Sequence, residues 1–159
     1  MRSKHLALIT FVGLLVLTGV AHGQTPAQTD KPKFDAELAA KVGADDYGMR
    51  KYVLVVLKTG PNKVPAGKER DEMFKAHLAN IQRLAAEGKL ALAGPLDGVD
   101  GWRGLFVFAV ADIEEAKKYV ATDPVIIKGE MIAEYHKYYG SAALMLVNES
   151  HDRVQKKSF

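Results

Sequence analysis

Histidine is the first side chain to consider for chemistry in this sequence, because the 159 residues include five histidines and no cysteine. The lack of thiols excludes cysteine nucleophiles, disulfide frameworks, iron–sulfur clusters and Cys-ligated zinc. Three histidines, His77, His136 and His151, lie beyond the first 23 residues. His77 is the strongest candidate for proton transfer, since it falls inside an apolar stripe of helical spacing between Phe74 and Ile81.

The residues alone leave two interpretations of His77 open. In the structural one, the imidazole is a core side chain bonded to a backbone carbonyl, because a buried imidazole without a partner costs about 1–3 kcal/mol. In the functional one, the imidazole works as a general acid or base, because histidine is the side chain that exchanges protons near neutral pH.

Three further residues are candidates for a substrate pocket. Gly94 has no Cβ, so a ligand can approach its backbone closely, and Pro95 stiffens the same strand end. A purely structural strand end is the simpler interpretation of this pair. Arg70 precedes His77 in the same predicted helix and could bind a carboxylate through two hydrogen bonds, although a solvated first-turn residue is the simpler interpretation.

No metal or other cofactor is predicted. Glu134 and His136 share one face of a predicted strand, but no third ligand lies near them in the sequence, so the polarity of an edge strand explains them more simply. None of the histidines has the surroundings of a proximal haem ligand. His151 lies in a polar tail and receives no role.

The elements that must position these residues follow from the hydrophobic pattern. Tyr52 to Leu57 is an apolar, β-branched run that predicts a strand buried on both faces. Acidic residues at 69–72, an apolar stripe and a stop at Gly88 predict the longest helix. The pattern also predicts strands at 90–93 and 105–110, a helix at 112–123 and an edge strand at 131–139. Trp102 and Arg103 then lie at a hairpin tip, where packing against a partner subunit is favoured over capping a pocket.

The predicted order is β-α-β-β-α-β, the α+β ferredoxin-like arrangement of an antiparallel four-stranded sheet with two helices on one face. Two of the strands are apolar on both faces, so the second sheet face would expose a large apolar patch. A homodimer formed through that face, a dimeric α+β barrel, is therefore expected. The alternative is that a helix predicted at 34–42, or the apolar cluster at 142–147, folds over the face within one chain.

The first 23 residues are typical of a cleaved Sec-type signal peptide. Arg2 and Lys4 precede an apolar run at 6–20 that is short for a bilayer span, and small residues follow. We therefore expect a periplasmic or secreted protein without a stable membrane anchor after cleavage. A flexible leader with a short helix would occupy 24–49, a single domain 50–140 and a tail 141–159.

The charge balance argues against a nucleic-acid partner. The formal net charge is +3, and it falls to +1 once Arg2 and Lys4 are removed with the signal. The chain contains no cluster of basic residues, so the electrostatic footprint of a DNA- or RNA-binding protein is missing.

Several short motifs in this order resemble the YCII-related domain family, small dimeric proteins of the ferredoxin-like α+β-barrel superfamily. The resemblance covers about residues 51–139, and the segment before it and the tail after Gly140 indicate an exported, elongated variant. The motifs are His77-Leu78, Glu87-Gly88-Lys89-Leu90 leading to Ala93-Gly94-Pro95, Glu114-Glu115-Ala116, and Asp123-Pro124 followed by Gly129.

The resemblance implies a site that the residues alone do not reveal. It implies that His77 and Asp123 meet in a pocket between helix and sheet and form a catalytic dyad. The expected function is metal-free acid/base chemistry, a lyase- or isomerase-like proton transfer on a small organic substrate, with Arg70, Gly94 and Pro95 binding that substrate. The alternative is a non-catalytic periplasmic dimer that binds a small ligand or serves in a stress response.

Overall fold

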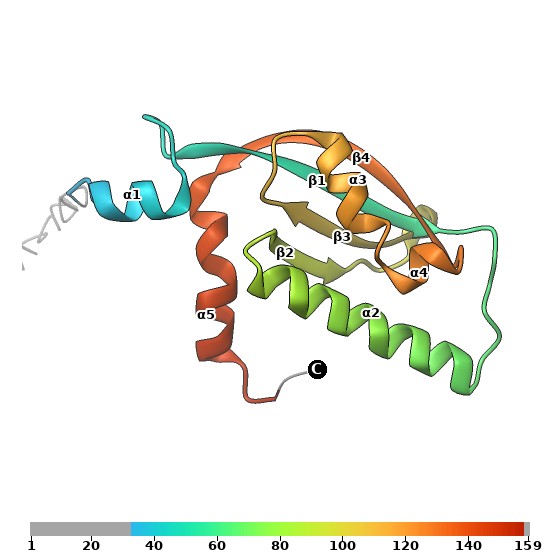
Figure 1. Ribbon diagram of the computed structural model, residues 1–159. Helices are drawn as coiled ribbons and strands as arrows, with labels where there is room; N and C mark the ends of the chain where they lie inside the picture. The colour runs from blue at the N-terminus through green and yellow to red at the C-terminus, as the bar shows by residue number, and fades with distance from the viewer. Residues whose placement is uncertain (1–32, 158–159) are drawn as a thin grey trace, which may run out of the picture. The chain divides into compact units, whose positions relative to one another are not determined.

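The computed structural model describes residues 33–157, and the fold is that of the compact unit that begins at Phe34 (Figure 1). The predicted signal peptide at 1–23 and the predicted leader up to residue 32 lie outside the described residues. Within 33–157, no helix is long and apolar enough to cross a membrane. The first element is α1 (Ala36–Val42), close to the predicted helix, and the Asp35 carboxylate caps it by accepting a hydrogen bond from the Leu38 N–H at 2.9 Å.

A four-stranded antiparallel sheet forms the centre of the unit and confirms the predicted ferredoxin-like order. Its strands are β1 (Met49–Thr59), β2 (Leu90–Pro95), β3 (Trp102–Phe108) and β4 (Met131–Ser141), arranged β2-β3-β1-β4. Val55 of β1 pairs with Phe106 of β3 on one side and with Tyr135 of β4 on the other. Because β1 is central and covered on both faces, its sequence is a continuous apolar run rather than an alternating one.

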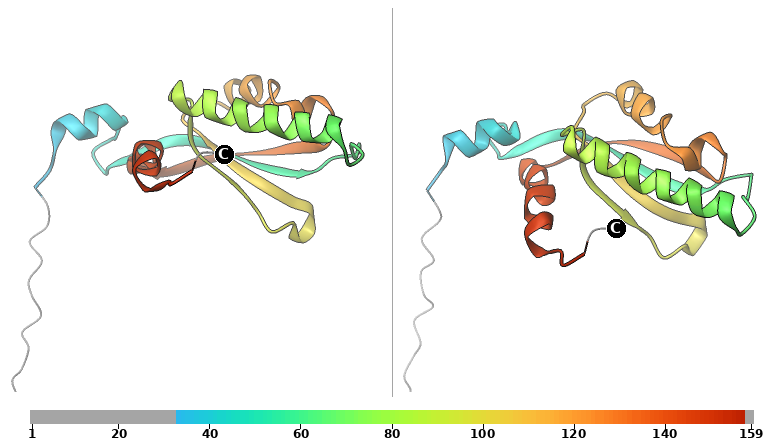
Figure 2. Two further views of the ribbon diagram at one scale, coloured as in Figure 1. Left: turned by 90° about the horizontal axis from the view of Figure 1, so that it is seen from below. Right: turned by 60° about the horizontal axis from the view of Figure 1, so that its bottom comes forward.

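Three helices cover one face of this sheet (Figure 2). They are α2 (Lys68–Ala86), α3 (Ile113–Val120) and α4 (Pro124–Ile127). Gly88 follows α2 with φ of 67°, a left-handed conformation that glycine adopts without strain, as the sequence pattern predicted. The core between helices and sheet contains alternate residues of β1 and β3 and the inner faces of α2 and α3: Val53, Val55, Leu57, Phe106, Phe108, Leu84, Ala116 and Val120.

Two segments within the predicted domain 50–140 differ from the prediction. The Asp123-Pro124 step follows the end of α3 and also begins α4, because the Asp123 carboxylate caps the new helix and the fixed φ of Pro124 suits its first turn. The hairpin tip is the short 3-10 helix η1 (Val99–Gly101), and β3 already begins at Trp102. Arg103 is therefore a strand residue and not a tip residue.

The opposite face of the sheet is covered in part by the segment that follows β4. In this segment η2 (Ala142–Leu146) places two apolar side chains against a small cluster on the sheet. α5 (Val147–Val154) comes next, and the Asn148 side chain donates a hydrogen bond to the Leu90 carbonyl at 2.8 Å. The residues of this contact are Leu144 and Met145 against Tyr52, Ala91 and Val107.

The β4 side of that face is more open within one chain. Ile132 and Tyr138, whose positions in the pleat lie on the face away from α2 and α3, are 49% and 39% exposed. The fold-back of the 142–147 cluster, one of the two arrangements considered from sequence, thus occurs over part of the face and leaves these side chains accessible.

Candidate functional site

His77 lies near the middle of α2, on the side of the helix that faces the sheet. Its ring is flanked by Phe74 of the same helix and by Phe106 of β3, with ring centroids 6.1 and 6.2 Å away. Its side chain is only 12% exposed. An imidazole so enclosed by aromatic rings requires a polar partner, because its ring nitrogens are largely withdrawn from water.

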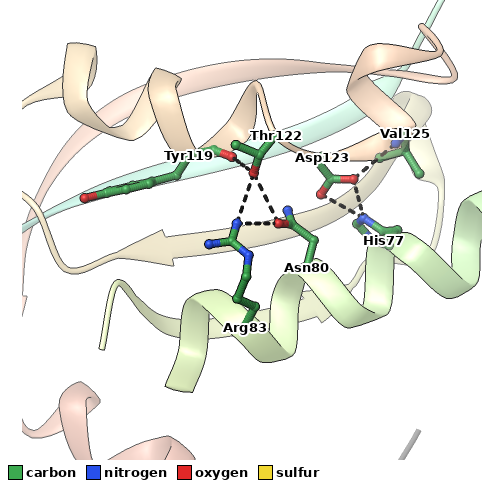
Figure 3. A network of polar contacts seen from close by, with 7 residues as sticks. All are labelled: His77, Asn80, Arg83, Tyr119, Thr122, Asp123 and Val125. Carbon is green, nitrogen blue, oxygen red and sulfur yellow. Dashed lines mark hydrogen bonds and ion pairs between the residues drawn. The ribbon is translucent and has the colours of Figure 1, made fainter. Parts of the chain in front are cut away.

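Asp123 is that partner, and Figure 3 shows the contact. Both carboxylate oxygens lie 2.8 Å from Nδ1 of His77, and one of them also accepts a hydrogen bond from the Val125 N–H at 3.1 Å. The Asp123 carboxylate is 1% exposed, and its place as the cap of α4 fixes its direction. The structure therefore brings together two residues that the sequence separates by 46 positions.

The contact also assigns the proton on the imidazole ring. An ionised carboxylate can only accept hydrogen bonds, so Nδ1 of His77 must donate. The other ring nitrogen, Nε2, makes no hydrogen bond to any of the residues 33–157. In the neutral ring Nε2 carries a lone pair, which is the form required of a proton acceptor.

A second polar cluster ties the turn that carries Asp123 to α2, one helical turn beyond His77 (Figure 3). The Asn80 side-chain oxygen accepts a hydrogen bond from Arg83 at 2.7 Å and lies 3.1 Å from the Thr122 hydroxyl. That hydroxyl has a single proton, which Asn80 shares with the Tyr119 carbonyl at 2.7 Å. Because Thr122 precedes Asp123 directly, this cluster helps to hold the carboxylate opposite His77.

His77 lines a cavity of about 460 Å³ between α2 and the β2–β3 part of the sheet. Apolar side chains make most of its wall, and Gly94 and Pro95 lie along it, as the interpretation of the strand end as pocket lining required. Two side chains in the wall carry ionisable groups, His77 and Arg103. The main apolar side chains are Leu57, Phe74, Leu78, Ile81, Phe106 and Met131.

Arg70 does not line this cavity. Its guanidinium lies 2.7 Å from the Glu130 carboxylate, donates a hydrogen bond to the Val64 carbonyl at 2.8 Å, and stacks over the Phe74 ring at 4.9 Å. The expected solvated first-turn residue is thus a half-buried one in a fixed ion pair. Arg70 instead lines a second, smaller cavity of about 260 Å³ beside Glu130. Its predicted role in substrate binding stays a prediction.

Glu130 is a buried carboxylate that sequence reasoning missed. It is 2% exposed, and besides Arg70 it accepts a hydrogen bond from the Val64 N–H at 2.7 Å. Burial raises the pKa of Glu130, but the Val64 N–H and the Arg70 guanidinium outweigh it, so the pKa of this carboxyl lies below its usual value. In the sequence, Glu130 is visible only as an acidic residue directly before the strand that begins at Met131. An acidic residue in that position can be buried or exposed, so the sequence did not reveal its burial.

Arg103 is a second residue outside the predicted site, because packing against a partner subunit was favoured over capping a pocket. It lines both the cavity of His77 and the smaller cavity beside Glu130. Its nearest carboxylate oxygen, Oε1 of Glu130, lies 3.9 Å from Nη1, which is beyond hydrogen-bonding distance. The strand β3 positions it there, because β3 extends further toward the hairpin than the hydrophobic pattern indicated.

On the opposite sheet face, Glu134 contacts both Lys58 at 3.1 Å and His136 at 2.9 Å. The contact with Lys58 is the main reason why the pKa of Glu134 lies below its usual value. These are exposed side chains on neighbouring strands. Within the described part of the chain, no three His, Cys, Asp or Glu side chains gather as a metal site would require.

Comparisons with known proteins identify a matching family model and a similar solved structure. The model of the YCII-related domain matches residues 51–136. Among solved structures, the chain is similar to 5-chloro-2-hydroxyhydroquinone dehydrochlorinase from Burkholderia phenoliruptrix AC1100, determined in complex with 2,5-dihydroxybenzoquinone. That match has 24% identity and a TM-score of 0.38, and it covers 52% of this chain and 90% of that one. A search of curated proteins found no match.

Proposed function

Because this chain belongs to the YCII-related domain family, we propose that it is an enzyme that moves a proton on a small organic molecule without a metal ion. In this proposal His77 is the acid/base residue and Asp123 is its positioning residue. The observation that carries the proposal is the contact of both Asp123 oxygens with Nδ1 at 2.8 Å, at the wall of an apolar cavity.

The proton transfer can be written with the groups at hand. Nε2 of His77 accepts a proton from a carbon next to an activating group of the substrate, and the ring becomes an imidazolium. The buried Asp123 carboxylate stabilises that positive charge through the Nδ1–H. The electron pair left on the substrate then either shifts a double bond and recovers the proton elsewhere, which is isomerisation, or expels a leaving group, which is a lyase reaction.

The test uses solvent exchange, since any reversible proton abstraction from carbon replaces hydrogen by deuterium in D2O. Purified protein is incubated in D2O with a small-molecule extract of the host, and proton NMR records which C–H signals disappear or shift. We expect signals that change with the wild type and change about 100-fold more slowly with His77→Gln. His151→Gln, an exposed histidine of α5, is the matched control and should behave as the wild type.

The alternative, a non-catalytic ligand-binding protein, predicts a different result in the same experiment. A small molecule would co-purify with the wild type and be identified by mass spectrometry, but no C–H signal would exchange. Exchange that persists unchanged in His77→Gln would also contradict the proposed role of His77.

We further propose a homodimer that uses the β4 side of the open sheet face. Exposure of Ile132 and Tyr138 there supports it, because burial of apolar surface stabilises association by about 25 cal/mol per Å² before association costs. Light scattering at micromolar concentration should give twice the mass of one chain. Ile132→Glu should halve that mass, whereas Ile127→Glu, at a more exposed isoleucine of α4, should not. A single-chain mass for the wild type contradicts the dimer.

Export to the periplasm or beyond is proposed from the first 23 residues. The basic start and the apolar run support a cleaved signal peptide. Mass spectrometry of protein from the host should find an N-terminus at or near Gln24. An intact Met1 chain in the cytosolic fraction would contradict export.

A further inference from the structure

Arg103 stands between two cavities of different chemistry. The cavity that contains His77 is mostly apolar, whereas the smaller one is lined by three cationic side chains, Lys63, Arg70 and Arg103, and by Glu130. Among the described residues, Arg103 is the one that lines both cavities. A molecule whose apolar part filled the first cavity would therefore meet a guanidinium at the border with the second.

The Arg103 guanidinium makes no hydrogen bond to a carboxylate of the described residues. Glu130 is the one carboxylate in the smaller cavity, and Arg70 already occupies it at 2.7 Å, together with the Val64 N–H at 2.7 Å. Arg103 lies 3.9 Å from the same oxygen and, within residues 33–157, its guanidinium donates no hydrogen bond. Three cations and one carboxylate leave this cavity with a formal net charge of +2.

From these observations we infer that the substrate is a small apolar molecule with a carboxylate, and that Arg103, assisted by Lys63, binds the carboxylate. The guanidinium fork suits a planar carboxylate, and its partly buried position at 30% exposure strengthens the pair relative to one in open water. The apolar part would then lie along Phe74, Phe106 and Leu78, within reach of His77. This inference rests on the proposed function, because it names the substrate class of the same cavity.

The experiment measures equilibrium binding and needs no turnover. Sodium benzoate is the probe, and benzamide, of the same shape without the charge, is the matched neutral probe; NMR titration of the full chain gives both affinities. We expect benzoate to bind more tightly than benzamide, and added salt to weaken only the benzoate complex. Arg103→Met should weaken benzoate binding at least tenfold and leave benzamide unchanged, while Arg153→Met in α5 should change neither.

If Arg103→Met fails to fold, two further variants still test the inference. Arg103→Lys, which keeps the charge but loses the fork, and Lys63→Met, in an exposed loop, should each weaken benzoate binding a few-fold. The inference is overturned if no benzoate binding is measurable, if benzoate binds no better than benzamide, or if every foldable variant binds benzoate as the wild type does.

The two proposals fail in different ways. His77→Gln should still bind benzoate, because the carboxylate contacts Arg103 and not His77. Selective benzoate binding without any solvent exchange would refute the proposed enzyme and leave the carboxylate site standing. Exchange that depends on His77, with benzoate and benzamide bound equally, would refute the carboxylate site and leave the enzyme standing.

Discussion

Asp123 and Glu130 are the two buried charged residues of the described chain, and each holds a basic side chain of α2. Asp123 contacts His77, and Glu130 contacts Arg70, which lies about two turns earlier in the same helix. Both carboxylates also accept a backbone N–H, from Val125 and from Val64 respectively. The two pairs thus share their architecture and differ in the base that they hold.

That difference separates the pair for which we propose a chemical role from a pair that can only be structural. A guanidinium keeps its proton throughout the pH range of proteins, so the Arg70–Glu130 pair can only bind and hold the loop at Val64 in place. An imidazole can gain or lose a proton, and the second nitrogen of His77, a residue that lines the larger cavity, makes no hydrogen bond to the described residues. A buried carboxylate is therefore not by itself evidence of catalysis. Whether such a pair can transfer protons depends on the side chain that the carboxylate contacts.

The largest effect is expected for Asp123→Asn on proton exchange. The asparagine amide can donate to Nδ1 and so force the proton onto Nε2, which removes the proposed proton acceptor. We expect at least a 100-fold slower exchange in D2O, with folding retained because asparagine also caps helices well.

Asp112→Asn is the matched control for this substitution. Asp112 caps α3 in the same manner, by accepting a hydrogen bond from the Glu114 N–H, but it lies outside the cavity. Its variant should exchange as the wild type does. Wild-type exchange in Asp123→Asn would show that the carboxylate does not position His77.

Glu130→Gln should act mainly on stability. Loss of the negative charge leaves the Arg70 guanidinium, 22% exposed, without its counterion, and we expect the free energy of unfolding to fall by about 2–3 kcal/mol. Urea unfolding measures this. Glu69→Gln, which breaks the exposed pair with Lys128, should leave the urea midpoint unchanged. Equal midpoints for all three proteins would contradict a structural role for Glu130.

The pH dependence of stability provides a second test of the structural role of Glu130. The pKa of Glu130 is lower in the folded protein than its usual value of 4.5, so the unfolded state binds a proton first as the pH falls. Its stabilising contribution is therefore complete above about pH 4.5 and is lost as the pH drops through the folded-state value. The difference in unfolding free energy between wild type and Glu130→Gln should narrow in acid. A difference that stays constant from pH 7 to pH 3 would contradict the shift.

The smallest effect is expected for Thr122→Val, which tests the cluster beside Asp123. Removal of the hydroxyl frees Asn80 and the Tyr119 carbonyl, and we expect about 0.5–1 kcal/mol of lost stability and a few-fold slower exchange. Thr122→Ser keeps the hydroxyl and should stay close to wild type. If both variants match the wild type in exchange, the cluster does not position Asp123.

Local elements were well predicted because their signals are local. The run Tyr52 to Leu57 predicted the central strand, and Gly88 marked the end of α2 through its left-handed conformation. The step at Asp123-Pro124 was predicted only as an end, although the same two residues also suit the start of a helix. A sequence pattern that ends one helix can also begin the next helix. The spacing of residues alone does not show which of these two roles applies.

The candidate site was predictable in part. His77 stood out because a polar ring interrupts an apolar stripe, and its partner Asp123 came from the family resemblance rather than from spacing. Arg70 was assigned to the same pocket because it shares the helix, but its side chain is bound by Glu130. Arg103 was assigned to a turn because the strand signal begins two residues after it.

The sequence by itself determined the β-α-β-β-α-β order of the four strands with α2 and α3, the position of His77 on the inner side of α2 and the family of the domain, since these depend on periodicity, caps and short motifs. Only the tertiary structure decided which carboxylate neutralises Arg70, that Arg103 borders both cavities, and at what distance Asp123 contacts His77. Those contacts join residues from different elements, and their geometry depends on how the strands and helices pack. The physical reason is that the attraction between charged groups depends on their distance in the folded chain, and the local sequence pattern does not contain that distance.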